Sequence, residues 1–212
     1  MSSLEWLLVA GIVAFYLQDA AVLLHYDEFV VGGGRRRWHA SAGGTEWSGR
    51  FLSLPNPLMP NAPVFRGTWP VAPGDADAGD IDGYLDTLLP FRFGTASLGI
   101  VLLLGVPAML SSYPHPLALL ALLVVVYGIV GGMTLLLWKR REPLGLSSRS
   151  CAWLAFECLA CPPHAINLVR KLTLRHPPAG AAATVAARLD DAGLDRLSRV
   201  MAQRITAFGA TA

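Results

Sequence analysis

The feature that most constrains the fold of this chain is a pair of long apolar runs, residues 94–110 and 117–138. Neither run contains a charged residue, and only residues 111–116 separate them. A helix needs about 20 apolar residues to cross a bilayer, and both runs approach or reach that length. We therefore predict a membrane helical hairpin, with spans over residues 94–113 and 116–138.

A third apolar stretch near the N-terminus predicts another span, over residues 4–25. A secretory signal peptide begins with positive charge, whereas this stretch follows Ser2 and Ser3 and contains Glu5 near its start. We expect an uncleaved helix. The chain is 53% hydrophobic and only 15% charged, against about 25% charged in typical soluble proteins, and the apolar residues are grouped in blocks. The predicted fold class is an all-α membrane protein with three transmembrane helices and interfacial amphipathic helices.

The basic residues indicate how the predicted spans are oriented. All 17 lysines and arginines fall within residues 35–92 or 139–204. Cytoplasmic loops next to spans carry an excess of these residues, so we predict the N-terminus outside and the C-terminus inside. The preference for Arg over Lys, with abundant Ala and Gly, suits a GC-rich bacterial genome and therefore a bacterial inner membrane. We expect anionic lipid headgroups to contact Arg35, Arg36, Arg37, Lys139, Arg140, Arg141, Arg170 and Lys171.

The inner loop, residues 26–93, is rich in proline. Four prolines between residues 55 and 63 exclude a helix there, and the flanking segments 50–54 and 64–69 predict a small β-hairpin. An acidic linker follows over residues 73–86. From about Asp80 we expect a short helix that ends at Pro90. Its apolar face is formed by Ile81, Tyr84, Leu85 and Leu88.

In the cytoplasmic C-terminal region, residues 139–212, the sequence predicts three helices that are too short or too polar to cross a bilayer. They cover about residues 150–161, 163–175 and 184–208. The second is a basic amphipathic helix, which we expect on the inner membrane surface. The third carries an apolar stripe that is typical of a packing face.

Asp19 is the first candidate site residue, since an ionised carboxylate inside a span costs about 2.5–3.5 kcal/mol on insertion scales. We expect it at the same depth as polar residues of the other spans. The predicted cluster is Gln18, Asp19, Ser97 and Thr134. The favoured interpretation is structural: these groups hydrogen-bond between helices, with Asp19 protonated or paired with Arg92. The functional alternative is a proton or cation site.

Cys158, Cys161 and His164 resemble half of a zinc site. The remaining cysteine, Cys151, lies about 10.5 Å from Cys158 along a helix, which is too far for ligands that share one zinc. Three cysteines within eleven residues do not form a secreted disulfide framework either. We expect free thiols and predict no metal and no cofactor.

These observations predict a non-catalytic integral membrane protein: an accessory subunit, assembly factor or scaffold of a membrane complex. A protein partner would bind through helix faces, such as the GxxxG pair Gly128 and Gly132, or through the cytoplasmic regions. The basic patches lack interleaved aromatic residues, which argues against nucleic acid. One alternative is a membrane enzyme with a thiol or metal site at the cytoplasmic interface, using Asp19, His25, Asp27 or the cysteine pair. The other is a small transporter subunit that uses Asp19.

Overall fold

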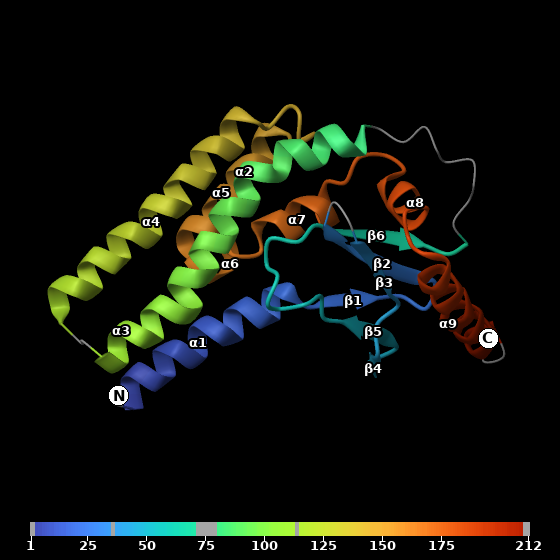
Figure 1. The fold of residues 1–212 in the computed structure, drawn as a ribbon, viewed down its shortest axis with the longest axis horizontal. Helices are drawn as coiled ribbons and strands as arrows, with labels where there is room; N and C mark the ends of the chain where they lie inside the picture. The colour runs from blue at the N-terminus through green and yellow to red at the C-terminus, as the bar shows by residue number, and fades with distance from the viewer. Residues whose placement is uncertain (1–2, 35–36, 71–79, 113–114, 210–212) are drawn as a thin grey trace.

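A group of long helices lies beside two small antiparallel sheets in the computed structural model (Figure 1). The structure describes residues 3–34, 37–70, 80–112 and 115–209. The helical elements are α1 Ser3–Ala20, α2 Ile81–Ile100, the π-helical turn η1 Val101–Gly105, α3 Val106–Ser112, α4 Pro116–Lys139, α5 Ser148–Ala160, α6 Pro162–Ala165, α7 Leu168–Arg175, α8 Ala181–Ala186 and α9 Asp191–Gly209. The strands are β1 Val22–Leu24, β2 Glu28–Gly34, β3 Arg37–Ser41, β4 Thr45–Trp47, β5 Arg50–Ser53 and β6 Val64–Thr68.

The predicted all-α fold is wrong, because the chain forms a mixed α/β structure. One sheet has the order β1-β5-β4 and the other β3-β2-β6, both antiparallel. Strands occur at both segments proposed for the β-hairpin, but β5 and β6 belong to different sheets and do not pair with each other. Each pairs instead with an earlier strand, β5 with β1 and β6 with β2.

Strand β2 shows why the sheets were missed. Its sequence ends in three glycines, a residue type that weakens a strand interior, yet Gly33 lies opposite Trp38 in the β2–β3 register. A Cβ on Gly33 would clash with the carbonyl of Arg37, so glycine here permits close approach of the two strands. Along β2, Phe29 and Val31 face the main core whereas Val30 faces the other sheet. Both faces are therefore buried.

The prediction of three spans is also wrong. Among the described residues, two helical segments are long and apolar enough to cross a membrane: the continuous helix over residues 81–112, and α4. Helix α1 has 18 residues, a length of about 27 Å, and the chain then enters β1. Residues 22–24, which we had assigned to the first span, are thus a strand. The start of α1 and the α3–α4 turn lie at the same end of the molecule (Figure 1).

Helix α2 has two halves with different environments. Its first half buries the predicted apolar face, Ile81, Tyr84, Leu85 and Leu88, with the Tyr84 ring 6.5 Å from that of Phe65 in β6. The helix does not end at Pro90 but continues through it and changes direction (Figure 1). Further along, the π-helical turn η1 precedes Pro107. A wider turn accommodates the proline, which has no N–H and whose ring would clash with the carbonyl four residues earlier.

The C-terminal helices pack on the sheets. Helix α8 contacts β6 and β2; it begins before the last predicted helix, about residues 184–208, which the structure divides between α8 and α9. Helix α9 buries Leu197 and Met201 of its apolar stripe and contacts β3. Arg204 of α9 lies 3.5 Å above the ring of Phe51 and donates to the carbonyl of Gly43 at 2.7 Å. The stripe is thus a packing face against β3 of the second sheet, while Arg204 reaches Phe51 in β5 of the first sheet.

Candidate functional site

Helix α7 lies at the junction between the long helices and the sheets, in contact with α2 and β6 (Figure 1). Every residue from Leu168 to Thr173 is buried. The expected position of Arg170 and Lys171 on the membrane surface is therefore incorrect: their exposed fractions are 2% and 4%. The amphipathic pattern predicted a helix with one buried apolar side and one side exposed to solvent. In the structure α7 packs against both α2 and β6, so its polar side is covered as well. The two basic side chains must be neutralised or hydrogen-bonded inside the protein.

Lys171 is neutralised by carboxylates from two other helices. Its Nζ lies 3.1 Å from Oδ2 of Asp19 in α1 and 2.9 Å from Oε2 of Glu157 in α5. The contact with Asp19 is an ion pair without hydrogen-bond geometry, whereas Lys171 donates a hydrogen bond to Glu157. Arg175 completes the network, with its Nη1 3.2 Å from Glu157 Oε1. Two positive and two negative charges thus join α1, α5 and α7.

The electrostatics of Glu157 follow from these contacts. Burial raises its pKa, but the hydrogen bonds and positive charges of Lys171 and Arg175 outweigh that effect. The net result is a pKa below the ordinary value, so Glu157 is ionised at neutral pH. Sequence reasoning missed this residue, although it is the only charged residue between Arg149 and Cys161.

The structure does not bring the predicted polar cluster together. Gln18 and Ser97 have exposed side chains, and the hydroxyl of Thr134 donates to the carbonyl of Gly131 at 2.9 Å. No hydrogen bond joins these three residues to Asp19 within the described part of the chain. Asp19 finds its partner in Lys171, which the sequence had placed on a membrane surface.

Arg170 has a different environment from its neighbour Lys171. Its Nη2 donates to the carbonyls of Asn56 at 2.6 Å and Met59 at 3.0 Å, and its Nη1 donates to Oδ1 of Asn167 at 3.3 Å. All three acceptors are neutral. Within the described residues Arg170 has no ion pair, and its buried Nε has no hydrogen-bond partner. Burial lowers the pKa of Arg170, an effect that the charge of Tyr16, a hydrogen bond with Tyr16 and the charge of Asp19 oppose.

The acceptors of Arg170 belong to the Pro-rich loop, residues 54–63. Prolines cannot donate backbone hydrogen bonds, so few N–H groups are available to satisfy the carbonyls of this loop. Side chains from three helices do so instead: Arg170 from α7, Tyr16 from α1 at the Pro57 carbonyl, and Arg92 from α2 at the Asn61 carbonyl. The loop thereby has a defined shape without regular secondary structure.

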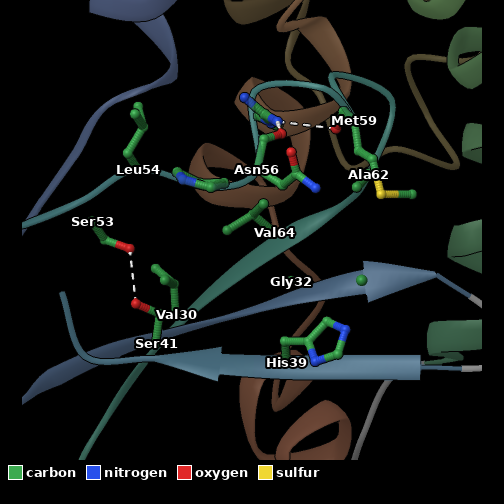
Figure 2. A pocket seen from close by; sticks show the side chains of 13 residues that line it. Val30, Gly32, His39, Ser41, Ser53, Leu54, Asn56, Met59, Ala62 and Val64 are labelled. Carbon is green, nitrogen blue, oxygen red and sulfur yellow. Dashed lines mark hydrogen bonds between the residues drawn. The ribbon is translucent and has the colours of Figure 1, made fainter. Parts of the chain in front are cut away.

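A pocket of about 250 Å³ lies between the Pro-rich loop and strands β2 and β3 (Figure 2). Arg170 lines it, together with the polar side chains of His39, Ser41, Ser53 and Asn56. Ser53 Oγ donates to Ser41 Oγ at 3.4 Å, across one side of the pocket (Figure 2). The remaining lining residues are Val30, Gly32, Gly33, Leu54, Pro55, Met59, Ala62 and Val64. No aspartate or glutamate lines it among the described residues, so its charged groups are basic.

The other residues expected to contact lipid occupy varied positions. Lys139 at the end of α4 and Arg37 on β3 are exposed, as a lipid contact requires. Arg140 donates to the carbonyl of Thr87 at 3.2 Å, and the guanidinium of Arg141 lies 5.1 Å from the ring centre of Trp138. Arg35 and Arg36 lie outside the described residues, as do residues 73–79 of the acidic linker.

The cysteines show the features of structural thiols. Cys151 and Cys158 are buried, and Cys161 is partly exposed. Burial raises the pKa of Cys158 to about 12, so this residue is a neutral thiol at physiological pH. His164 packs edge-on against Phe15 at 5.9 Å. Within the described residues no group of three or more His, Cys, Asp or Glu side chains is placed to hold a metal ion.

Helix α7 therefore presents two buried cations with different roles. Lys171 is neutralised by internal carboxylates, whereas Arg170 is bonded to neutral groups and lines a pocket. Such a pocket has the charge to receive an anion. Comparisons of the chain with models of protein families, with curated proteins and with solved structures found no significant match.

Proposed function

We propose that this chain is a non-catalytic membrane protein, an accessory subunit or scaffold, anchored by the hairpin of residues 91–139. Helix α4 is the observation that carries the proposal. It is apolar along its length, yet only Val126, Val130, Met133 and Leu137 are buried. Their spacing of four, three and four residues forms a single seam against the rest of the protein.

The other sides of α4 expose large apolar side chains. They are Leu117, Leu120, Leu123, Val124, Val125, Tyr127, Leu135 and Trp138. A helix in the core of a soluble protein would bury such residues, and an apolar surface of this extent marks a contact with lipid or with another protein. Its 24 residues have a length of about 36 Å, enough to cross a hydrocarbon layer of about 30 Å.

Exposed aromatic residues support a membrane boundary at the end of α4. Trp138 lies in its last turn, and Trp153 and Phe156 are both 61% exposed on the neighbouring helix α5. Tryptophan is enriched at headgroup level, where its ring is partly in hydrocarbon and partly in water. Lys139, Arg140 and Arg141 follow directly, which favours the cytoplasmic side for this end and for the sheets.

A partner helix has an open surface on α4. A Cβ placed on Gly128, Gly131 or Gly132 would meet no atom within 4 Å. Gly128 and Gly132 are one turn apart on a side of the helix that does not include the buried seam. Helices associate in membranes by close van der Waals packing at small residues, so this surface suits a helix of another protein.

The native mass of the protein tests the proposal. We expect the chain to purify in mild detergent as a stable complex with another protein. Replacement of Gly128 and Gly132 by leucine should dissociate it, because the added side chains hold the partner helix away. The Leu123→Phe variant is a matched control, since it enlarges a side chain that is already exposed on another side of the same helix. A homogeneous single chain in mild detergent, with normal stability, would contradict the accessory role.

Cysteine labelling tests the orientation separately. In a Cys161→Ser background, Ser111→Cys at the hairpin turn should react with a membrane-impermeant maleimide on intact cells. Arg149→Cys, exposed at the start of α5, should react only after the membrane is opened. Equal reactivity of the two positions on intact cells would contradict the hairpin topology.

A further inference from the structure

The charge of Arg170 is incompletely compensated inside the protein. A buried guanidinium is costly unless it is paired, and the partners of Arg170 are neutral: two backbone carbonyls, one amide and the Tyr16 hydroxyl. Asp19, the acidic side chain whose charge acts on it, is ion-paired with Lys171. Its Nε remains buried with no hydrogen-bond partner in the part of the chain that the structure describes. An anion in the adjoining pocket would complete this environment.

The pocket has the size and lining for a small oxyanion. Its volume of about 250 Å³ is below the 300–1,000 Å³ that is typical of drug-sized ligands. Ser41, Ser53 and Asn56 supply neutral hydrogen-bonding groups to the lining that also contains Arg170; Figure 2 labels these three residues. Arginine is the preferred partner of phosphate, because its planar donors match the geometry of the oxygens.

The Pro-rich loop connects the pocket with the apolar surface of the protein. Its Leu58 is 88% exposed, and Leu54 and Met59 are about half-exposed. Pro60 of this loop packs beside Gly99: a Cβ added to Gly99 would lie 3.5 Å from Pro60 Cγ. Gly99 lies about eight residues into the spanning part of the α2–α3 helix. The loop that forms one wall of the pocket therefore lies next to a membrane-spanning segment and carries apolar side chains outward.

From these observations we infer that the pocket lined by Arg170, Ser41, Ser53 and Asn56 is a binding site for a phosphate group. Two sources share this chemistry: the headgroup of an anionic phospholipid, which the exposed loop would bring to the pocket, and free inorganic phosphate. The site is independent of the partner surface on α4.

Two variants test the site. Arg170→Met removes the charge and keeps an apolar stem in the buried position. Gly32→Val partly fills the pocket and leaves every contact of Arg170 in place; the added Cβ would lie at ordinary contact distances, 3.4 Å from Val64 Cγ2 and 3.6 Å from the Pro63 carbonyl. Valine also suits the interior of a strand. The matched control is Arg196→Gln, which removes an exposed basic residue of α9 outside the pocket.

The full-length protein is studied in nanodiscs for both sources. In the first arm, discs of phosphatidylcholine with and without phosphatidylglycerol are analysed by native mass spectrometry for retained lipid. In the second arm, inorganic phosphate is added to phosphatidylcholine discs at constant ionic strength, and the thermal unfolding midpoint is measured. We expect saturable binding in at least one arm, weakened about tenfold or more by both pocket variants and unchanged in Arg196→Gln.

The pattern of results identifies the source or overturns the site. Retention of one phosphatidylglycerol that depends on Arg170 and Gly32 assigns the site to a lipid headgroup. A stabilising effect of phosphate alone, with the same dependence, assigns it to the free anion. If Arg170→Met does not fold, Gly32→Val decides the question. No saturable binding to the unmodified protein, pocket variants that bind as it does, or an equal loss in Arg196→Gln would each overturn the inference.

Discussion

The carboxylate of Asp19 is held by Lys171, whose Nζ lies 3.1 Å from Asp19 Oδ2 although the two residues are at opposite ends of the chain. The side chain of Lys171 is 4% exposed and that of Asp19 is 15% exposed. The pair fixes the end of the first helix to the C-terminal half of the protein. It also gives a structural role to the one acidic residue near the end of the N-terminal apolar stretch.

Replacement of Lys171 by methionine should strongly destabilise the protein. The variant leaves the carboxylates of Asp19 and Glu157 partly buried without their shared cation, and breaking a buried ion pair from one side costs about 3–5 kcal/mol. Thermal unfolding in detergent measures the effect. The surface pair of Arg188 and Asp82 provides the control, since exposed ion pairs contribute about 0–1 kcal/mol. An equal loss of stability in Arg188→Met and Lys171→Met would show that the buried network contributes no more to stability than an exposed ion pair.

The stability of the protein should depend on pH through Glu157. The pKa of Glu157 in the folded protein lies below the ordinary value of 4.5. The ionised carboxylate therefore contributes fully to the free energy of unfolding above pH 4.5. This contribution is lost as the pH falls through the lower pKa of the folded protein. We therefore expect the unfolding midpoint to decrease as the solution is acidified below about pH 4.5. Unfolding scans of the protein and of Glu157→Gln should converge at low pH. A difference between them that stays constant over this range would exclude the linkage.

The three cysteines should differ in reactivity. Cys158 is buried with a pKa raised to about 12, and burial also raises the pKa of Cys151, so neither thiolate is available at neutral pH. We expect a maleimide to modify Cys161 first, because it is partly exposed. Mass spectrometry of timed samples gives the order. In a Cys161→Ser variant the folded protein should remain largely unmodified, whereas denaturant should expose both remaining thiols; rapid modification of folded Cys158 would contradict its buried position.

Gly67 should not tolerate even a methyl group. A Cβ at this position would lie 2.7 Å from Phe29 Cζ and 2.9 Å from Ala182 Cβ, between the second sheet and α8. We expect Gly67→Ala to cost about 1–3 kcal/mol through overpacking. Gly44→Ala is the matched control, since its Cβ would meet no atom within 4 Å. Thermal unfolding distinguishes the two, and a Gly67→Ala variant as stable as Gly44→Ala would show that Phe29 can move aside.

The hairpin could be predicted from the sequence because its signal is local. Uninterrupted apolar runs need no information about distant residues, and the first half of α2 was likewise marked by the spacing of Ile81, Tyr84 and Leu88. The sheets gave a weaker signal. Strand β1 continues an apolar run, and β2 contains the glycines that usually interrupt structure, so partners elsewhere in the chain were required to reveal both.

The candidate site could not be located in this way. Arg170 and Lys171 are adjacent in the sequence, and a basic pair on a short amphipathic helix is usually exposed. Only the folded chain places Asp19 and Glu157 around Lys171. It likewise places the Pro-rich loop and the pocket beside Arg170.

The sequence by itself determined which helices are apolar enough for a membrane, because hydrophobic content and length are properties of a continuous segment. The tertiary structure decided which polar groups meet. Burial of a charge depends on what surrounds it from every side, and at α7 those surroundings come from α1, α2, α5 and the sheets. The same physical reason separates Lys171, which is neutralised by carboxylates, from Arg170, which is bonded to neutral acceptors.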